Sequence, residues 1–230
     1  GKRARHAYSF DDIAIVPSRR TRTPEDVSTT WQIDAYKFDL PLIAAPMDSI
    51  VSPASAQVLS DLGMLATLNV EGLWGRYEDP TKLLKEIASL PSESATKRLQ
   101  EIYAAAAVNP ELIAKRVAEL KAAGITVAVA VSPQATAALA PVVAKAGADL
   151  VVIRGTTVSA EHVAAENEAL NLKKFIYELD VPVIVGGVAT TTGALHLMRA
   201  GAAGVLVGFG GAAAHTTQTV LGIQVPMATA

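Results

Sequence analysis

A glycine-rich segment, Gly208–Gly211, carries the groups of this sequence best suited to hold an anion. The segment follows an apolar run at Val205–Val207. Glycines placed there let backbone N–H groups approach a phosphate closely. Because a glycine cluster after a strand is weak evidence alone, the pattern predicts a phosphate-binding loop only where other residues support it.

The side-chain inventory excludes several kinds of chemistry. The 230 residues contain no cysteine, which excludes disulfides, thiolate metal sites and thiol nucleophiles. The four histidines have no metal-binding spacing with acidic residues, and neither HExxH nor a serine–histidine–aspartate order is present. One of them, His196, has apolar spacing within a predicted helix, and we expect it to be partly buried.

Composition and charge narrow the class of protein. The net charge is −2, so no electrostatic footprint for nucleic acid or an acidic membrane is present. Half of the residues are hydrophobic but only 5% are aromatic, which predicts a large aliphatic core. We see no charge-free apolar run of about 18 residues and no apolar leader. With the absence of cysteine, this predicts a cytoplasmic protein.

Short aliphatic runs recur along the chain and predict the elements that position the glycine loop. They are continuously apolar, apart from Thr67, rather than alternating, which is typical of parallel strands buried on both faces. The runs are Leu42–Ala45, Met64–Leu68, Val127–Val131, Leu150–Ile153, Val183–Val185 and Val205–Val207.

The stretches between these runs predict helices. Pro110–Ala123 and Thr190–Ala200 each end at a glycine, and residues 80–90 and 94–106 predict two more helices in a long connection. Three joints, "AAGITVAV", "KAGADLVVI" and "RAGAAGVLV", repeat one order of helix end, Ala-Gly, turn and strand. Such a glycine supplies the left-handed residue after a helix. The repeat predicts βαβ units in series.

The predicted fold is an α/β TIM (β/α)₈ barrel truncated to about six βα units, because eight units close a barrel. An open six-stranded sheet is the alternative. Residues 1–40 do not fit the repeat. They predict an N-terminal arm with a short strand in "YSFDDIAIVPSRR" and a capping hairpin, and residues 41–230 predict the incomplete barrel domain.

Three motifs in order identify a family resemblance. "FDDIAIVPS" (10–18), "PLIAAPMDSIVS" (41–52) and "GVLVGFGGAAAHTTQTVLGIQVPMATA" (204–230) resemble the entry segment, first strand and active-site loop of the IMP dehydrogenase/GMP reductase family. "LNVEGLWGRYEDP" and "RLQEIYA" resemble the IMP dehydrogenase-related paralogue, which lacks CBS domains. Members of that branch are longer and continue into two further βα units.

The resemblance implies an oxidoreductase of purine metabolism. It would convert IMP to XMP with NAD, a step of GMP biosynthesis, or reduce GMP with NADPH. The family uses a loop cysteine as nucleophile, and His215 stands at that position, so the resemblance implies impaired chemistry. Thr217 matches the threonine that assists hydrolysis or deamination. His215 as a positioning or structural residue, and Thr217 as a local hydrogen-bonding residue, are the alternatives.

The resemblance also implies binding residues. Arg154 stands where dehydrogenases have an acid, and it would favour a phosphate-bearing cofactor or pair with Glu161. Met47 would lie beneath the nucleotide or pack the barrel top. The implied substrate-binding residues are Met47, Asp48, Gly208, Gly210, Gly211 and Ala213, where Ala213 replaces a serine. The implied NAD or NADP residues are Arg154, Gly155, Gly186 and Gly187, and K⁺ would bind the carbonyls of Gly210, Ala212 and His215.

Two other interpretations stay open. The chain could be a catalytically silent nucleotide-binding or assembly paralogue, because the cysteine and the phosphate-binding serine are absent. It could also be a fragment without independent function. The expected partner is a purine nucleoside monophosphate, and a homo-oligomer is expected if the barrel is complete, because uncovered strand edges invite association.

Overall fold

The computed structural model describes residues 4–155, 170–210 and 217–230. The chain divides into two compact units: Thr30–Ile153 with Leu179–Val183, and Gly1–Thr29 with Arg154–Glu178 and Ile184–Ala230. Six strands form a sheet in the order β3-β4-β5-β6-β7-β8, which is also their order along the chain. Parallel pairing in chain order with helices between the strands confirms the predicted barrel-type α/β fold with six strand units.

The unit that begins at Thr30 contains β3 (Ile43–Ala44), β4 (Leu65–Asn69), β5 (Ala128–Val131) and all but the last residue of β6 (Leu150–Arg154). Every residue of β5 is buried, as are all but the last residues of β4 and β6. This burial explains the continuous apolar runs, since a strand covered on both faces has no side that favours polar residues. The edge strand β3 has two residues, and short edges limit unwanted pairing.

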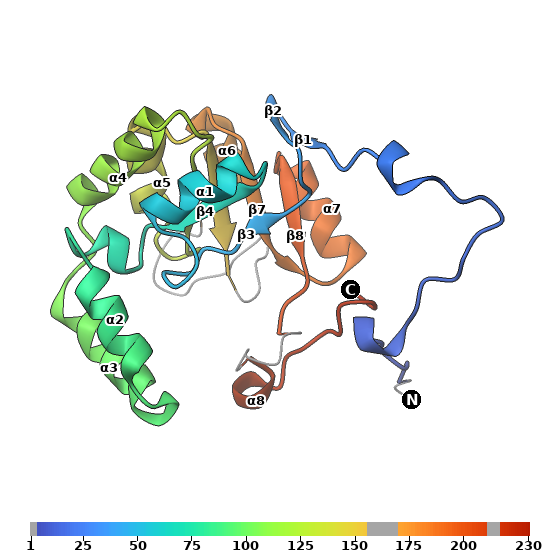
Figure 1. Ribbon diagram of the computed structural model, residues 1–230, viewed down its shortest axis with the longest axis horizontal. Helices are drawn as coiled ribbons and strands as arrows, with labels where there is room; N and C mark the ends of the chain where they lie inside the picture. Colours follow the sequence, from blue (N-terminus) through green and yellow to red (C-terminus); the bar gives the residue numbers. More distant parts are fainter. Residues whose placement is uncertain (1–3, 156–169, 211–216) are drawn as a thin grey trace. The chain divides into compact units, whose positions relative to one another are not determined.

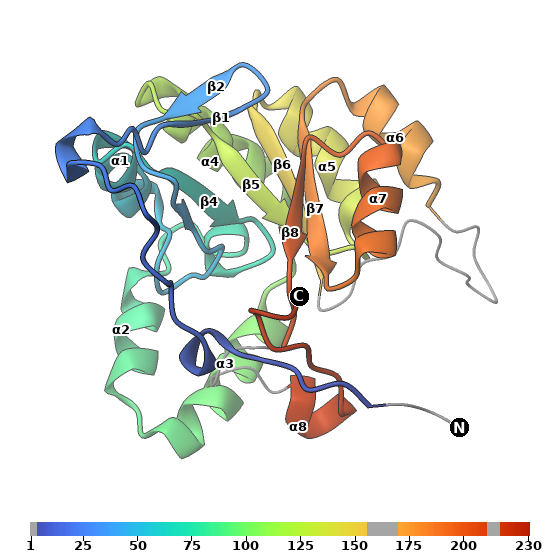
Figure 2. The same cartoon turned by 90° about the vertical axis from the view of Figure 1, so that its right-hand side faces the viewer.

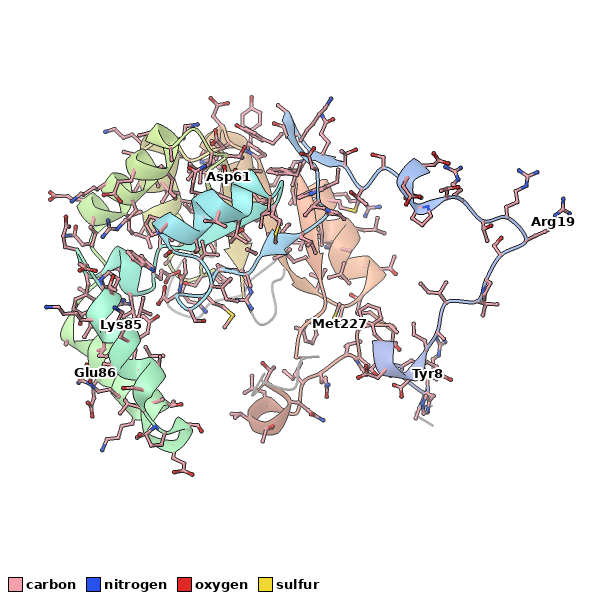
Figure 3. All side chains as sticks on the ribbon, viewed as in Figure 1. Tyr8, Arg19, Asp61, Lys85, Glu86 and Met227 are labelled. Atoms are coloured by element: carbon pink, nitrogen blue, oxygen red, sulfur yellow. The ribbon has the colours of Figure 1, made fainter. Side chains whose placement is uncertain are left out.

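Helices of this unit connect the strands. They are α1 (Pro53–Asp61), α4 (Pro110–Ala122) and α5 (Thr136–Lys145) between strands, with α2 (Thr81–Ser89) and α3 (Ser92–Ala105) in the β4–β5 connection. Figure 1 shows α2 and α3 side by side as a helical hairpin. An ion pair of 2.5 Å joins Arg98 of α3 to Glu86 of α2, which is labelled in Figure 3. The sequence predicted both helices of the hairpin to within two residues.

A β-hairpin of β1 (Trp31–Ile33) and β2 (Tyr36–Phe38) precedes the sheet. The Tyr36 hydroxyl donates to Asp149 Oδ1 at 3.1 Å. Asp149 directly precedes β6, so the hairpin is tied to the amino-terminal end of that strand.

The other unit holds most of β7 (Val183–Val188) and all of β8 (Gly204–Val207), with α7 (Thr191–Arg199) packed along β8. Figure 2 shows β7, β8 and α7 as neighbours. The short helix α8 (Thr217–Leu221) lies near the chain's end, and α6 (Leu172–Leu179) precedes β7. Register between β7 and β8 shifts at Gly186 and Val188, which is a bulge at the carboxyl end of the pair.

The three repeated helix–strand joints have the predicted glycine conformation. Gly124, Gly147 and Gly201 have φ of +76°, +99° and +100°. Nothing lies within 4 Å of a side chain added at Gly124, so the left-handed conformation alone favours glycine there.

Two sequence predictions are wrong. Residues 13–17 form no strand, and Ile15 is 98% exposed, because no described segment pairs with them. Instead, 3₁₀ turns form at η1 (Phe10–Asp12) and η2 (Pro24–Asp26), and Figure 3 shows the Arg19 side chain extending outward from the stretch between them. His196 lies on the exposed side of α7, whereas its neighbour Leu197 is buried. Among the helices of the described ranges, none has the length and apolar character that crossing a bilayer requires.

Candidate functional site

Met47 and Asp48 lie in the turn that follows β3, and they differ sharply in environment. The Met47 side chain is 47% exposed. The Asp48 carboxylate instead turns inward, where Oδ2 accepts from the Leu73 N–H at 2.8 Å and from the Tyr103 hydroxyl at 2.6 Å. Its Oδ1 is buried without a partner among the described residues, and Gly72 packs against the carboxylate so closely that a side chain would not fit. Of these two predicted substrate residues, only Met47 presents an exposed side chain.

Tyr103 holds its proton in this environment. Burial raises the pKa of Tyr103, and its hydrogen bond to the Asp48 carboxylate and the charge of that carboxylate raise it further. Arg76 opposes these effects, since its guanidinium lies 4.9 Å from the ring centroid. The phenol therefore stays a hydrogen-bond donor to Asp48 across the physiological pH range.

Arg76 fastens the carboxyl end of α3. Its guanidinium donates to the carbonyl oxygens of Glu71 at 2.9 Å, Tyr103 at 3.1 Å and Ala106 at 2.6 Å. The last carbonyls of a helix have no partner within the helix, and a cation is favourable there. Arg76 therefore joins the hairpin of α2 and α3 to the segment that follows β4.

Glu71 joins the carboxyl ends of β4 and β5. Its two carboxylate oxygens accept from the backbone N–H and the hydroxyl of Ser132, the residue directly after β5. The Ser132 carbonyl in turn accepts from the Thr136 hydroxyl at 2.7 Å. The carboxyl ends of barrel strands carry the active sites of such folds, so these polar groups are candidates for the functional site.

In the unit that contains β8, backbone hydrogen bonds bring the predicted cofactor residues together. Gly155 donates to the Gly186 carbonyl at 2.8 Å and accepts from the Gly187 N–H at 3.1 Å. Arg154 is exposed, and no ion pair joins it to another described residue. Its predicted alternative partner, Glu161, lies outside the described residues.

Glycines also pack the loop after β8 against the end of β7. A side chain on Gly187 would meet the Gly208 carbonyl oxygen at 2.2 Å, and Gly208 donates to the Val188 carbonyl at 2.5 Å. Gly208 and Gly210 have φ of +97° and +66°. Both the close approach and the left-handed backbone require glycine here. The loop thus begins at a glycine whose backbone lies directly against the end of β7.

Of the two predicted catalytic residues, Thr217 is described and His215 is not. Thr217 is the first residue of α8 and is 6% exposed, and it lies beside Gly210, where an added side chain would be 3.6 Å from its Cβ. The remaining loop residues of the prediction, Gly211, Ala212 and Ala213, lie outside the described residues. For the predicted K⁺ site, only Gly210 is therefore described. No group of three acidic or histidine side chains that could hold a metal occurs within the described ranges.

The two ends of the chain meet in this unit. The Tyr8 N–H donates to the Thr229 hydroxyl at 2.7 Å, and Met227 Sδ lies where a side chain on Gly208 would be, 2.2 Å from its Cβ. Figure 3 labels Tyr8 and Met227. The tail therefore covers one side of the start of the glycine loop.

Sequence reasoning missed Arg76, Tyr103, Glu71 and Ser132. Asp48 and Tyr103 are 55 residues apart, and Glu71 and Ser132 are 61 apart. No local spacing reveals such pairs. The available signal was that Asp48 and Tyr103 both fall in segments with family resemblance, "PLIAAPMDSIVS" and "RLQEIYA".

Comparison with known proteins gives one family. The model of the IMP dehydrogenase / GMP reductase domain matches residues 7–230. An uncharacterized oxidoreductase of Mycobacterium tuberculosis is 53% identical over all of this chain, which covers 63% of that protein. The corresponding oxidoreductase of Mycolicibacterium smegmatis is 52% identical with the same coverage. The chain therefore spans less than two thirds of the length of these relatives.

A solved structure agrees with the sequence matches. The crystal structure of an IMP dehydrogenase/GMP reductase-like protein from Corynebacterium glutamicum has a TM-score of 0.91 and 49% identity, over 99% of this chain and 60% of that one. An inosine-5'-monophosphate dehydrogenase of Methanocaldococcus jannaschii is 30% identical over 66 residues. The predicted resemblance is confirmed: the chain belongs to the IMP dehydrogenase/GMP reductase family of oxidoreductases.

Proposed function

We propose that this chain forms the purine-mononucleotide site of an IMP dehydrogenase-related oxidoreductase, which acts on IMP with NAD or on GMP with NADPH. The observation that carries the proposal is the glycine loop that begins at Gly208, where it packs on Gly187 at the carboxyl ends of β7 and β8. Backbone N–H groups in such a loop favour a phosphate. Family membership supports a purine nucleoside monophosphate as the bearer of that phosphate.

The groups around Gly155 fit a nicotinamide dinucleotide. The exposed Arg154 guanidinium suits a phosphate group, and backbone hydrogen bonds hold Gly155, the residue that follows it, against Gly186 and Gly187. The dinucleotide would accept or supply the hydride. A monovalent cation at the carbonyls of Gly210, Ala212 and His215 remains part of the proposal.

His215 limits the chemistry that we propose for this chain. A thiolate is a soft nucleophile, and the chain has no cysteine to provide one. We therefore propose nucleotide binding with little turnover, and Thr217 as the residue placed to assist hydrolysis if an adduct forms. His215→Cys should increase turnover, measured from nicotinamide absorbance with IMP or GMP. Wild-type turnover equal to that of the variant would contradict this role for position 215.

A silent assembly partner is the second candidate, favoured by the absence of cysteine. It would bind other family members, as a homo-oligomer or with an active relative, without binding nucleotide. Light scattering measures the assembly that the second candidate predicts, and calorimetry with IMP separates the two candidates, because only the first predicts that the chain binds IMP.

Calorimetric titration with IMP, GMP and XMP tests the proposed site. Gly208→Ala should weaken binding at least about tenfold, or about 1.4 kcal/mol. The reason is that strain of about 1–3 kcal/mol at a left-handed position and the contact with Met227 both displace the loop. Gly222→Ala is the matched control, because Gly222 has φ of +67° but no atom within 4 Å of an added side chain. Equal affinities for both variants would contradict the proposed phosphate loop.

A further inference from the structure

We infer that Tyr103 is a positioning residue, whose hydroxyl holds Asp48 and thereby fixes the exposed Met47 at the end of β3. This inference rests on the proposed function, because Met47 matters only if the carboxyl ends of the strands bind nucleotide. It gives the hairpin of α2 and α3 a part in shaping the turn after β3, although Tyr103 and Asp48 are 55 residues apart.

The Asp48 carboxylate is held from two sides. The Tyr103 hydroxyl and the Leu73 N–H both donate to Oδ2, at 2.6 and 2.8 Å. Oδ1 is buried and Gly72 packs against the carboxylate. A carboxylate so placed is directed into the protein, and hydrogen bonds to a charged group are among the stronger ones in a protein. Asp48 therefore acts as an anchor.

Movement of this anchor moves Met47. Asp48 lies inside a turn in which the Met47 carbonyl accepts from the Ile50 and Val51 N–H groups, each at 2.9 Å. Val51 is 1% exposed and fixes the far end of the turn in the core. The Met47 side chain, in contrast, is 47% exposed and has little packing of its own. Its position thus depends on the turn, and the turn depends on Asp48.

Tyr103 is itself firmly placed. Arg76 binds the carbonyls of Tyr103 and Ala106, and the Tyr77 hydroxyl donates to the Ile102 carbonyl at 2.6 Å. The hydroxyl groups of Tyr77 and Tyr103 thus both donate hydrogen bonds near the base of the hairpin of α2 and α3. Tyr77 stays within that base, whereas Tyr103 reaches out to the turn after β3. This difference supplies a matched pair of variants.

Tyr103→Phe removes the hydroxyl and keeps the ring. We expect the backbone amides of Leu73, Ile50 and Val51 to exchange hydrogen about tenfold faster, because one charge-assisted hydrogen bond no longer opposes local opening. Tyr77→Phe removes an equivalent hydroxyl from the hairpin base and should leave those amides protected. Amide-resolved hydrogen exchange makes the comparison without any ligand.

Calorimetry with IMP gives the second readout. Tyr103→Phe should weaken IMP binding about three- to tenfold by lowering the fraction of chains with Met47 in place, and Tyr77→Phe should not. Unchanged amide exchange in Tyr103→Phe, or equal loosening in both variants, overturns the inference. If wild type binds no nucleotide, the proposed function fails while hydrogen exchange still decides the positioning.

A second variant tests the same hydrogen bond from the side of its acceptor, Asp48. If Tyr103→Phe fails to fold, Asp48→Asn replaces it, because the amide keeps the shape and removes the charge. It should loosen the same three amides while those of α3 stay protected. Protection equal to wild type in Asp48→Asn overturns the inference.

Discussion

Removing Asp149 should destabilise the unit that contains the β-hairpin by about 3 kcal/mol. Its Oδ2 accepts from the Val127 N–H at 2.8 Å, and Val127 is 1% exposed. An alanine leaves that buried N–H unpaired, which costs about 1–3 kcal/mol. Loss of the Tyr36 hydrogen bond adds about 1 kcal/mol. The ion pair with Lys121, whose side chain is 43% exposed, adds less than about 1 kcal/mol.

Urea unfolding followed by circular dichroism measures this effect as a shift in midpoint at constant slope. Asp149→Asn serves as the graded control, since its single carbonyl oxygen can replace only one of the two acceptors. A double-mutant cycle with Tyr36→Phe should give a coupling free energy of about 0.5–1.5 kcal/mol. A loss of unfolding free energy below about 1 kcal/mol for Asp149→Ala, or no coupling to Tyr36, would refute the role of Asp149 in joining the hairpin to β6.

Three further predictions concern single groups. Thr67 is fully buried and its hydroxyl has no partner among the described residues, so Thr67→Val should raise the unfolding free energy by about 1 kcal/mol; a lower melting temperature would contradict this. Gly124→Ala should lower the unfolding free energy by about 1 kcal/mol, because the backbone at this position has φ of +76°. An unchanged melting temperature would contradict this prediction. The raised pKa of Tyr103 means that its contribution to stability is complete below the unfolded value of 10.0 and is lost as pH rises above it. The stability difference between wild type and Tyr103→Phe should therefore shrink at alkaline pH, and a constant difference would contradict the assignment.

The strands were predictable because burial on both faces leaves a plain signature. All six apolar runs became strands, with ends displaced by at most three residues. The glycines of the helix–strand joints were predictable for a local reason, because one residue with left-handed φ ends each helix. Both signals lie within a few residues of the feature that they predict.

The predictions that failed depend on distant partners. Residues 13–17 have the composition of a strand, but a strand requires a neighbour and the described chain offers none. The inward turn of Asp48 depends on Tyr103, 55 residues later, and the family motif alone placed Asp48 among ligand contacts. Sequence reasoning thus located the loops of the candidate site and missed the hydrogen bonds that hold them.

The comparison of IMP with inosine tests the central claim most directly, because the two differ only in the phosphate. Calorimetric titration of the purified chain should show micromolar binding of IMP and at least about tenfold weaker binding of inosine, as expected if the glycine loop that begins at Gly208 holds the phosphate. Equal affinities, or no binding of either compound, would contradict the proposed mononucleotide site.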